Sequence, residues 1–178
     1  MSDIFELETR DPEAFRQETR KSTFILIGIF AVLGMGLSTL SVAYFGQPDA
    51  NNFVWNALGV FAGFVLTTVL FKTVLWNHPL MEASVYSWKL KRCLMKVTNV
   101  MHHVDAGVAQ NNVTAIQLLR FYHLGLMQMH RLENNEGGIS ELRKPMQSLL
   151  VKIEELGLDP EQTRFDPAWI DAVKQLKP

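Results

Sequence analysis

Four of the five histidines in the chain fall within 29 residues, between His102 and His130. Two are adjacent in "NVMHHVDAG" (99–107), and "RFYHLGLMQMH" (120–130) adds His123 and His130. Imidazole is a common zinc ligand and general acid or base, so such a group could bind a metal ion or transfer protons. Whether it does depends on the elements that position the four rings.

Helical geometry predicts that the four rings do not converge. His123 and His130 share the helix face of Leu119 and Leu126, but seven residues separate them by about 10.5 Å along the axis. One zinc ion with bonds of about 2 Å cannot bridge that distance. His102 and His103 belong to the polar face of the preceding helix. In an antiparallel hairpin, His123 would lie opposite about residue 96 of that helix and His130 opposite about residue 89, so neither would meet His102 or His103.

Two local pairs remain as metal-ligand candidates, His102 with Asp105 and His130 with Glu133, each three residues apart. Two ligands make an incomplete site that a partner chain would have to complete. Cys93 falls on an apolar helix stripe, which favours a buried hydrophobic role over a nucleophilic one. The sequence contains no G-x-x-x-x-G-K-[ST], G-x-S-x-G or C-x-x-C motif. We therefore expect no cofactor and no catalytic residue.

Two long apolar runs precede the histidines. No charged residue occurs in "TFILIGIFAVLGMGLSTLSVAYF" (23–45) or in "FVWNALGVFAGFVLTTVLF" (53–71). As helices they would be roughly 34 and 28 Å long, enough to cross a hydrocarbon core of about 30 Å. The sequence predicts two transmembrane helices. The first follows a polar segment and lacks an A-x-A-like end, so we expect a retained anchor instead of a cleaved signal peptide.

Lysine and arginine flank the two runs on the same side. Arg10, Arg16, Arg20 and Lys21 precede the first span and Lys72 follows the second, whereas the connecting "GQPDANN" has no positive charge. The positive-inside rule then predicts cytoplasmic termini and an exterior turn, as in a bacterial inner-membrane protein. Within the spans, Gly59 with Gly63, and Gly34 with Ser38, are small-xxx-small pairs that allow close helix packing. They could serve the hairpin itself or a second copy.

Helical periodicity continues beyond the spans. Seven apolar residues follow 3-4 spacing between residues 79 and 104: Ala83, Tyr86, Leu90, Cys93, Val97, Val100 and Val104. A turn at 105–112, with Gly107 as C-cap, leads to a second helix at about 113–132 with a stripe of Ala115, Leu119, Tyr122, Leu126 and Met129. A flexible linker (133–138), a helix at about 141–156 and a short helix capped by Asp166 complete the pattern, with Pro145 expected to weaken or delay the third helix.

These patterns divide the chain into four predicted segments. They are a cytoplasmic N-terminal segment (1–22), a transmembrane hairpin (23–76, spans about 23–45 and 53–75), a long helical hairpin (77–135) and C-terminal helices (136–178). No segment shows the alternation expected of a strand. The predicted fold is all-α: a two-span transmembrane hairpin followed by a cytoplasmic antiparallel helical hairpin or bundle.

A basic cluster follows the second span. Lys89, Lys91, Arg92 and Lys96, together with Lys72, could contact anionic headgroups or nucleic acid. Because the cluster is close to the membrane exit, topology and lipid contact explain it most simply. The remaining soluble region is balanced in charge, and we expect no nucleic-acid partner.

Four segments taken in order resemble a small proteobacterial inner-membrane family that is described only as a domain of unknown function. They are "ETRKSTFILIGIFAVLGMGLSTLSVAYFG", "NFVWNALGVFAGFVLTTVL", "LMKVTNVMHHVDAGV" and "LLRFYHLGLMQMHRL". The resemblance covers roughly residues 4–135 and fades in the C-terminal region. It implies a bacterial inner membrane, and it brings no activity, cofactor or catalytic residue.

The sequence thus favours a non-catalytic anchor, scaffold or accessory subunit. Such a protein would present its cytoplasmic helical domain to a protein partner or to a second copy, with the lipid bilayer as its other partner. The alternative is a membrane-tethered enzyme or metal-binding protein that uses the His/acid pairs. Transport is less favoured, because the spans carry no ionisable residue in their interior that would mark a pathway.

Overall fold

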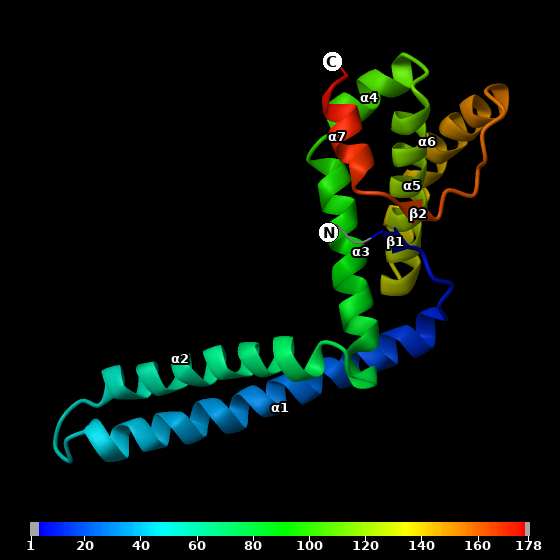
Figure 1. Cartoon of the computed structure of the whole chain (residues 1–178). Helices are drawn as coiled ribbons and strands as arrows, with labels where there is room; N and C mark the ends of the chain where they lie inside the picture. Colours follow the sequence, from blue (N-terminus) through cyan, green and yellow to red (C-terminus); the bar gives the residue numbers. More distant parts are fainter. Residues whose placement is uncertain (1–3, 177–178) are drawn as a thin grey trace. The chain divides into compact units, whose positions relative to one another are not determined.

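A computed structural model describes residues 4–176, and it is helical along most of that length (Figure 1). Two compact units can be distinguished. One comprises residues 17–85, and the other joins residues 4–16 to residues 86–176. The N-terminal residues therefore fold with the C-terminal half of the chain and not with the apolar helices that follow them.

The unit of residues 17–85 is an antiparallel pair of long helices. Helix α1 (Pro12–Phe45) runs without interruption, and α2 (Phe53–Leu70) continues into a π-helical turn, η1 (Phe71–Leu75). Asp11 caps α1, because its carboxylate accepts a hydrogen bond from the Ala14 amide at 2.8 Å. Both helices are long and apolar enough to span a membrane, and only 6% and 11% of their most apolar stretches are buried.

Small residues allow α1 and α2 to approach closely. A Cβ atom built on Gly63 would lie 2.6 Å from Gly34 Cα, and one on Gly59 would lie 2.4 Å from Ser38 Cα. Either distance is shorter than a real carbon–carbon contact, so backbone meets backbone at both positions. Beside them, Ser38 Oγ donates a hydrogen bond to Asn56 Oδ1 at 2.8 Å. Backbone contact and this hydrogen bond join α1 and α2 at these positions, and ring contacts between Phe30 and Phe64 and between Phe45 and Trp55 join them elsewhere.

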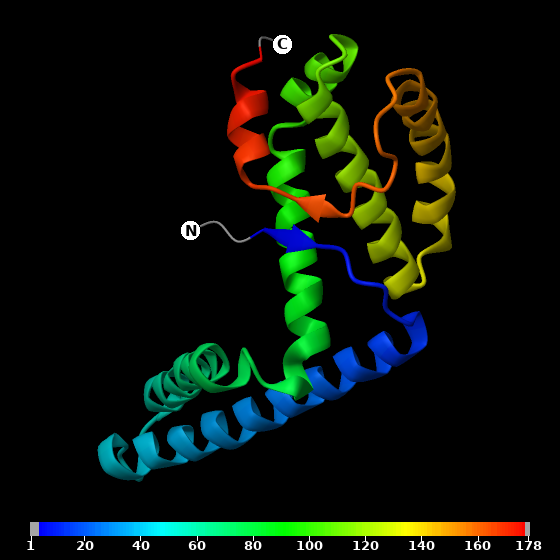
Figure 2. The same cartoon turned by 45° about the vertical axis from the view of Figure 1, so that its right-hand side comes forward.

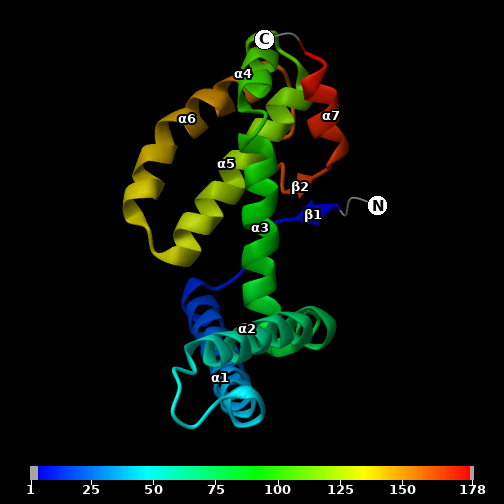
Figure 3. The ribbon, with the colours of Figure 1, turned by 90° about the vertical axis from the view of Figure 1, so that its left-hand side faces the viewer.

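Helix α5 (Val113–Glu133) is the central element of the other unit. Helix α6 (Glu136–Glu155) lies on one side of α5, and α3 (Glu82–Thr98), α4 (Met101–Ala109) and α7 (Ala168–Lys174) lie on the other (Figures 2 and 3). Ile116 of α5 packs with Leu149 and Ile153 of α6. On the opposite side, Gly125 brings α5 close to Leu90 and Leu94 of α3.

The seven-residue stripe predicted on α3 and α4 is buried at every position, with no member more than 7% exposed. The helix itself, however, ends at Thr98 and not near Val104. The Thr98 hydroxyl bonds back to the Leu94 carbonyl at 3.0 Å, an alternative to regular helical bonding that residues such as Thr and Asn offer. After a turn at Asn99 and Val100, α4 resumes and carries the stripe to Val104.

The predicted C-cap role of Gly107 is wrong. Gly107 lies inside α4, where a Cβ atom would meet Ala115 Cβ at 2.6 Å and Leu176 Cδ1 at 2.7 Å. Asn111, with a φ of +57°, makes the turn instead. Asn112 then caps α5 by accepting a hydrogen bond from the Ala115 amide at 3.1 Å. The glycine serves close packing of α4 on α5, and asparagine supplies the left-handed residue.

The predicted linker at 133–138 is much shorter in the structure. Asn134 is left-handed, and Asn135 caps α6 by accepting from the Gly138 amide at 3.0 Å. Pro145 neither delays nor interrupts α6 but lies within it. The helix therefore begins at its asparagine cap, and its packing on α5 through Leu149 and Ile153 holds the part beyond the proline.

Two short strands, absent from the sequence prediction, join the ends of the chain. Strand β1 (Phe5–Glu6) pairs antiparallel with β2 (Arg164–Phe165), with Phe5 opposite Phe165 and Glu6 opposite Arg164. The Leu7 amide extends the pairing by donating to the Thr163 carbonyl at 2.9 Å. Figure 2 shows the two strands side by side.

Candidate functional site

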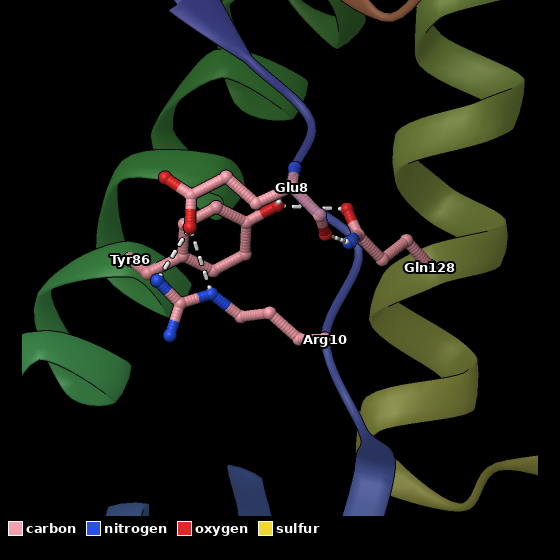
Figure 4. A network of polar contacts seen from close by, with 4 residues as sticks. All are labelled: Glu8, Arg10, Tyr86 and Gln128. Atoms are coloured by element: carbon pink, nitrogen blue, oxygen red, sulfur yellow. Dashed lines mark hydrogen bonds and ion pairs between the residues drawn. The ribbon is translucent and has the colours of Figure 1, made fainter.

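The most connected polar group in the described chain closes the N-terminal segment onto α3 and α5 (Figure 4). The Glu8 amide donates to Tyr86 Oη at 3.0 Å, and the Tyr86 hydroxyl donates to Gln128 Oε1 at 2.9 Å. Gln128 Nε2 completes the circuit by donating to the Glu8 carbonyl. We call Glu8, Arg10, Tyr86 and Gln128 the N-terminal clamp, because three separate parts of the chain meet there.

Arg10 adds an ionic contact to the clamp. Its Nε and Nη2 atoms donate to Glu8 Oε2 at 3.0 and 2.5 Å, and its guanidinium carbon lies 4.5 Å from the centre of the Tyr86 ring. A cation at this distance from an aromatic face is attracted by the ring quadrupole. Burial raises the pKa of the Tyr86 phenol, so the hydroxyl keeps the proton that it donates to Gln128.

Aromatic side chains surround the same tyrosine. Phe5 precedes Glu8 and Arg10 in sequence, and Phe15 follows them. Their ring centroids lie 5.6 and 6.2 Å from that of Tyr86. Phe5 also meets Phe121 of α5 edge-on at 6.4 Å. Such pairs add to the hydrophobic burial of the rings. The clamp is thus a structural joint between the N-terminal segment and the helices.

A second polar group, Arg120 with His123, is buried on α5. Both side chains are 6% exposed, and Arg120 Nε donates to the Pro160 carbonyl at 2.7 Å. Arg120 Nη1 and His123 Nδ1 have no hydrogen-bond partner among residues 4–176. Burial, and then the neighbouring Arg120 charge, lower the pKa of His123 from 6.5 to about 4. His123 is therefore neutral at physiological pH.

The structure gives the other candidate histidines separate neighbours. His102 is exposed, whereas His103 is half-buried with its Nδ1 atom 3.0 Å from the Leu176 carbonyl. The His130 ring lies against Gly138, and its Nδ1 atom is 3.3 Å from Asn135 Nδ2. Glu133, the predicted partner of His130, forms an ion pair with Lys91 at 2.6 Å. Within residues 4–176, no group of three or more His, Cys, Asp or Glu side chains could hold a metal ion.

The remaining candidates serve packing or surface roles. Cys93 is buried, and burial raises the pKa of its thiol, which opposes thiolate formation. In the predicted basic cluster, Lys72, Lys89 and Arg92 are exposed. Lys91, by contrast, is paired with Glu133, and the Lys96 ammonium lies 5.9 Å from the centre of the Phe165 ring.

Sequence reasoning missed both polar groups of the folded unit. The helical spacing predicts Tyr86 as a stripe residue, but the partners of its hydroxyl group come from segments 78 and 42 residues away. Glu8 and Arg10 belong to a polar N-terminal segment that carries no periodic signal. The sequence offers one indication that Arg120 is buried. It is a charged residue between Leu119 and Phe121, on a helix that is apolar on more than one side.

A comparison with protein families matches residues 5–170 to the family described as "Protein of unknown function (DUF3087)". The chain belongs to this family. No curated protein and no solved structure gave a significant match.

Membership of the DUF3087 family extends beyond the region in which the sequence resemblance was recognised. The match begins at Phe5 in β1 and ends at Ile170 in α7, so it includes both strands, the clamp and the C-terminal helices. The family description names no activity, and no residue role follows from it.

Proposed function

We propose that this DUF3087 protein is a non-catalytic membrane anchor. In this proposal α1 and α2 cross a membrane as a hairpin, and the unit formed by residues 4–16 and 86–176 is held at one membrane surface. There it presents helix faces to a protein partner as a scaffold or accessory subunit. A second copy of the chain is the alternative partner for these helix faces.

The observation that carries the proposal is the joining of both flanks of the hairpin into one folded unit. Strand β1 precedes α1, β2 follows α2, and the two pair in register. The clamp adds hydrogen bonds from Glu8 to Tyr86 and Gln128. A bilayer cannot divide a folded unit, so both flanks must be on the same side of any membrane that the hairpin enters. An even number of spans meets this requirement.

Exposure of the apolar helices supports a membrane environment. Phe24, Val32 and Met35 of α1 are 73%, 70% and 66% exposed, and Phe53 and Phe61 of α2 are 70% and 62% exposed. A contiguous apolar surface of this kind on a monomer marks an interaction site or a lipid-facing surface. Burial against hydrocarbon would remove that surface from water.

Charge supports assignment of the folded unit to the cytoplasmic side of a bacterial inner membrane. Arg16, Arg20 and Lys21 precede the apolar part of α1, and Lys72 lies in η1 directly after α2, whereas the loop between the helices contains Asp49 and no positive charge. Positively charged flanks are retained in the cytoplasm during insertion.

The anchor proposal is tested by reporter fusions in a bacterial host. A reporter enzyme active only outside the cytoplasm should give signal when fused at Asp49, and no signal when fused at Arg20 or Asn135. Signal from the Asn135 fusion would overturn the two-span arrangement. Purification in mild detergent should recover a partner in a fixed ratio to the chain, or a homo-oligomer.

A separate measurement addresses the enzyme or metal alternative. The purified chain is analysed for transition metals beside a His102→Ala variant and a His130→Ala variant. We expect no stoichiometric metal in any of the three. About one zinc or iron ion per chain that disappears in either variant would replace the scaffold proposal with a metal-binding one.

A further inference from the structure

The outward face of α3 combines aromatic, apolar and basic side chains. Tyr86, Leu90, Cys93 and Val97 form the buried side of the helix. Trp88 and Met95 lie on the opposite side, seven residues apart, and are 46% and 64% exposed. The Arg92 guanidinium carbon lies 5.0 Å from the centre of the Trp88 ring, and Lys89 is exposed at the margin. We call Trp88, Lys89, Arg92 and Met95 the outer α3 face.

The outer α3 face lies in a stretch of sequence that is basic without acidic residues. No acidic residue occurs between Ala83 and Val104. Of the four basic residues of α3, Lys91 is neutralised by Glu133, and Lys96 lies over the ring of Phe165. These two basic residues therefore face their own folded unit. Lys89 and Arg92 are exposed, beside an exposed tryptophan and methionine.

The chain connections favour lipid as the occupant of this face. Only six residues (76–81), which include the 3-10 turn η2 (Pro79–Met81), separate the end of η1 at Leu75 from the start of α3 at Glu82, so the second apolar helix is joined to α3 by a short connection. The other connection enters at the same end of α3, because Phe15 packs on Tyr86, two residues from Trp88. If the apolar helices span a membrane, both chain connections keep the outer α3 face near the surface of that membrane. Trp, Lys and Arg together are typical of segments that lie at an anionic lipid interface.

We propose that the outer α3 face lies on the headgroups of anionic phospholipids in the membrane that holds the α1–α2 hairpin. Lys89 and Arg92 contact the phosphates, while Trp88 and Met95 enter the boundary between headgroups and acyl chains. This inference rests on the proposed membrane anchor. It adds that the folded unit contacts the bilayer through α3, in addition to its covalent connections to the hairpin.

The test places a polarity-sensitive fluorophore on the full chain. A Cys93→Ala background carries either Met95→Cys on the outer α3 face or, as matched control, Val151→Cys on α6, where the native side chain is 48% exposed. Both proteins are reconstituted into nanodiscs of phosphatidylcholine alone, or of equal parts phosphatidylcholine and phosphatidylglycerol. Nanodiscs leave both membrane faces accessible to iodide, which quenches fluorophores in water.

In the anionic discs, we expect iodide quenching at position 95 to be about threefold lower than at position 151, as burial in the interface would produce. Lys89→Glu with Arg92→Glu should abolish the difference between anionic and neutral discs at position 95. Arg143→Glu with Lys144→Glu, an equal charge change on the exposed surface of α6, should leave it intact.

Equal quenching at positions 95 and 151 in both kinds of disc would overturn the proposal. The proposal would also be overturned if iodide quenching at position 95 were as low in detergent as in the anionic discs and the particle contained two chains. That result would assign the outer α3 face to contact with a second copy. Neither result affects the reporter signal at Asp49, so failure of the lipid contact is distinguishable from failure of the anchor.

Discussion

His123 links burial of a single side chain to the pH dependence of stability. Its pKa is lowered from 6.5 to about 4 in the folded protein, first by burial and then by Arg120. The unfolded chain therefore binds a proton more readily, and native stability is lost as the pH falls from about 6.5 toward 4. Between pH 7 and 5 this group alone accounts for a loss of about 2 kcal/mol.

The first prediction concerns His123→Leu in the detergent-solubilised chain. The change removes both the titrating group and the unpartnered Nδ1 atom, so the variant should remain folded and lose less thermal stability than wild type between pH 7 and 5. His102→Leu, at an exposed position, is the control and should behave as wild type. Melting temperatures across this range provide the measurement. An unchanged acid response would mean that His123 is accessible to water in the native state.

The second prediction concerns the hydroxyl group of the clamp. Tyr86→Phe keeps the ring for Phe5 and Phe15 but leaves the Glu8 amide and Gln128 Oε1 without their shared partner. The expected cost is about 1–2 kcal/mol. Hydrogen exchange at Glu8 should accelerate by about tenfold, since 1.4 kcal/mol corresponds to that factor. Tyr122→Phe, at a half-buried position on α5, should leave this exchange unchanged.

At the scale of elements, substitutions at helical glycines distinguish the contribution of helix propensity to stability from the contribution of packing. Alanine in place of a helical glycine gains up to about 1 kcal/mol from propensity alone. At Gly107 the added Cβ would lie 2.6 Å from Ala115 Cβ and 2.7 Å from Leu176 Cδ1, and pushing α4 away from α5 costs about 1–3 kcal/mol. At Gly137 of α6 the nearest atom would be 3.6 Å away, an ordinary contact.

The third prediction is that these two substitutions have opposite signs. Gly107→Ala should lower the melting temperature of the folded unit, and Gly137→Ala should raise it or leave it unchanged. Thermal unfolding in detergent, followed by tryptophan fluorescence, compares the two variants directly. A stabilising Gly107→Ala would show that α4 and α5 are farther apart than their contact implies.

The fourth prediction applies the same reasoning to the hairpin. Gly63→Val places side-chain atoms against the Gly34 backbone, so the two helices must separate locally. Gly36→Val is the matched control, because a Cβ atom there meets nothing within 4 Å. A spin-label pair across α1 and α2 should report an increased distance in the first variant and none in the second. An unchanged distance in Gly63→Val would contradict the close packing of the hairpin.

Elements that bury one stripe could be predicted from sequence, and those that bury several sides could not. The seven-residue stripe of α3 and α4 was confirmed, because one face packs while the other remains exposed. On α5 the predicted stripe is mostly half-buried, and the most buried side chains include Ile116, Leu118 and Phe121. Helix α5 has neighbours on several sides, so no single period describes its burial.

The candidate site was beyond such reasoning for a different reason. Strands of two residues are too short to show alternation, and the N-terminal clamp joins side chains from three elements. Lys91 and Glu133 illustrate the same difficulty: each looked like a surface or ligand residue in sequence, and the fold pairs them with each other. Sequence periodicity reports which face of an element is apolar, but not which distant polar group will meet it.

At the scale of the whole molecule, the connection between the ends of the chain constrains topology. Glu6 precedes the apolar helices and Arg164 follows them, yet the two are neighbours across the β1–β2 pair. Cross-strand neighbours have Cα atoms about 4.5–5.5 Å apart, which lies within the range that a disulfide can bridge. The pairing therefore offers a chemical test of whether both flanks of the hairpin share one side of the membrane.

The fifth prediction is that Glu6→Cys with Arg164→Cys, in a Cys93→Ala background, forms a disulfide in isolated membranes treated with a mild oxidant. The control combines Glu6→Cys with Glu141→Cys, which places the second thiol on the exposed surface of α6. More than about half of the test protein should lose two hydrogens by mass spectrometry and migrate faster without reductant, since paired strands hold the thiols within bonding distance. The control should remain largely reduced, because a bond between distant thiols requires the unit to unfold. Equal yields in the two proteins would mean that β1 is not paired with β2 in the membrane, and the argument that places both flanks on one side would fail with it.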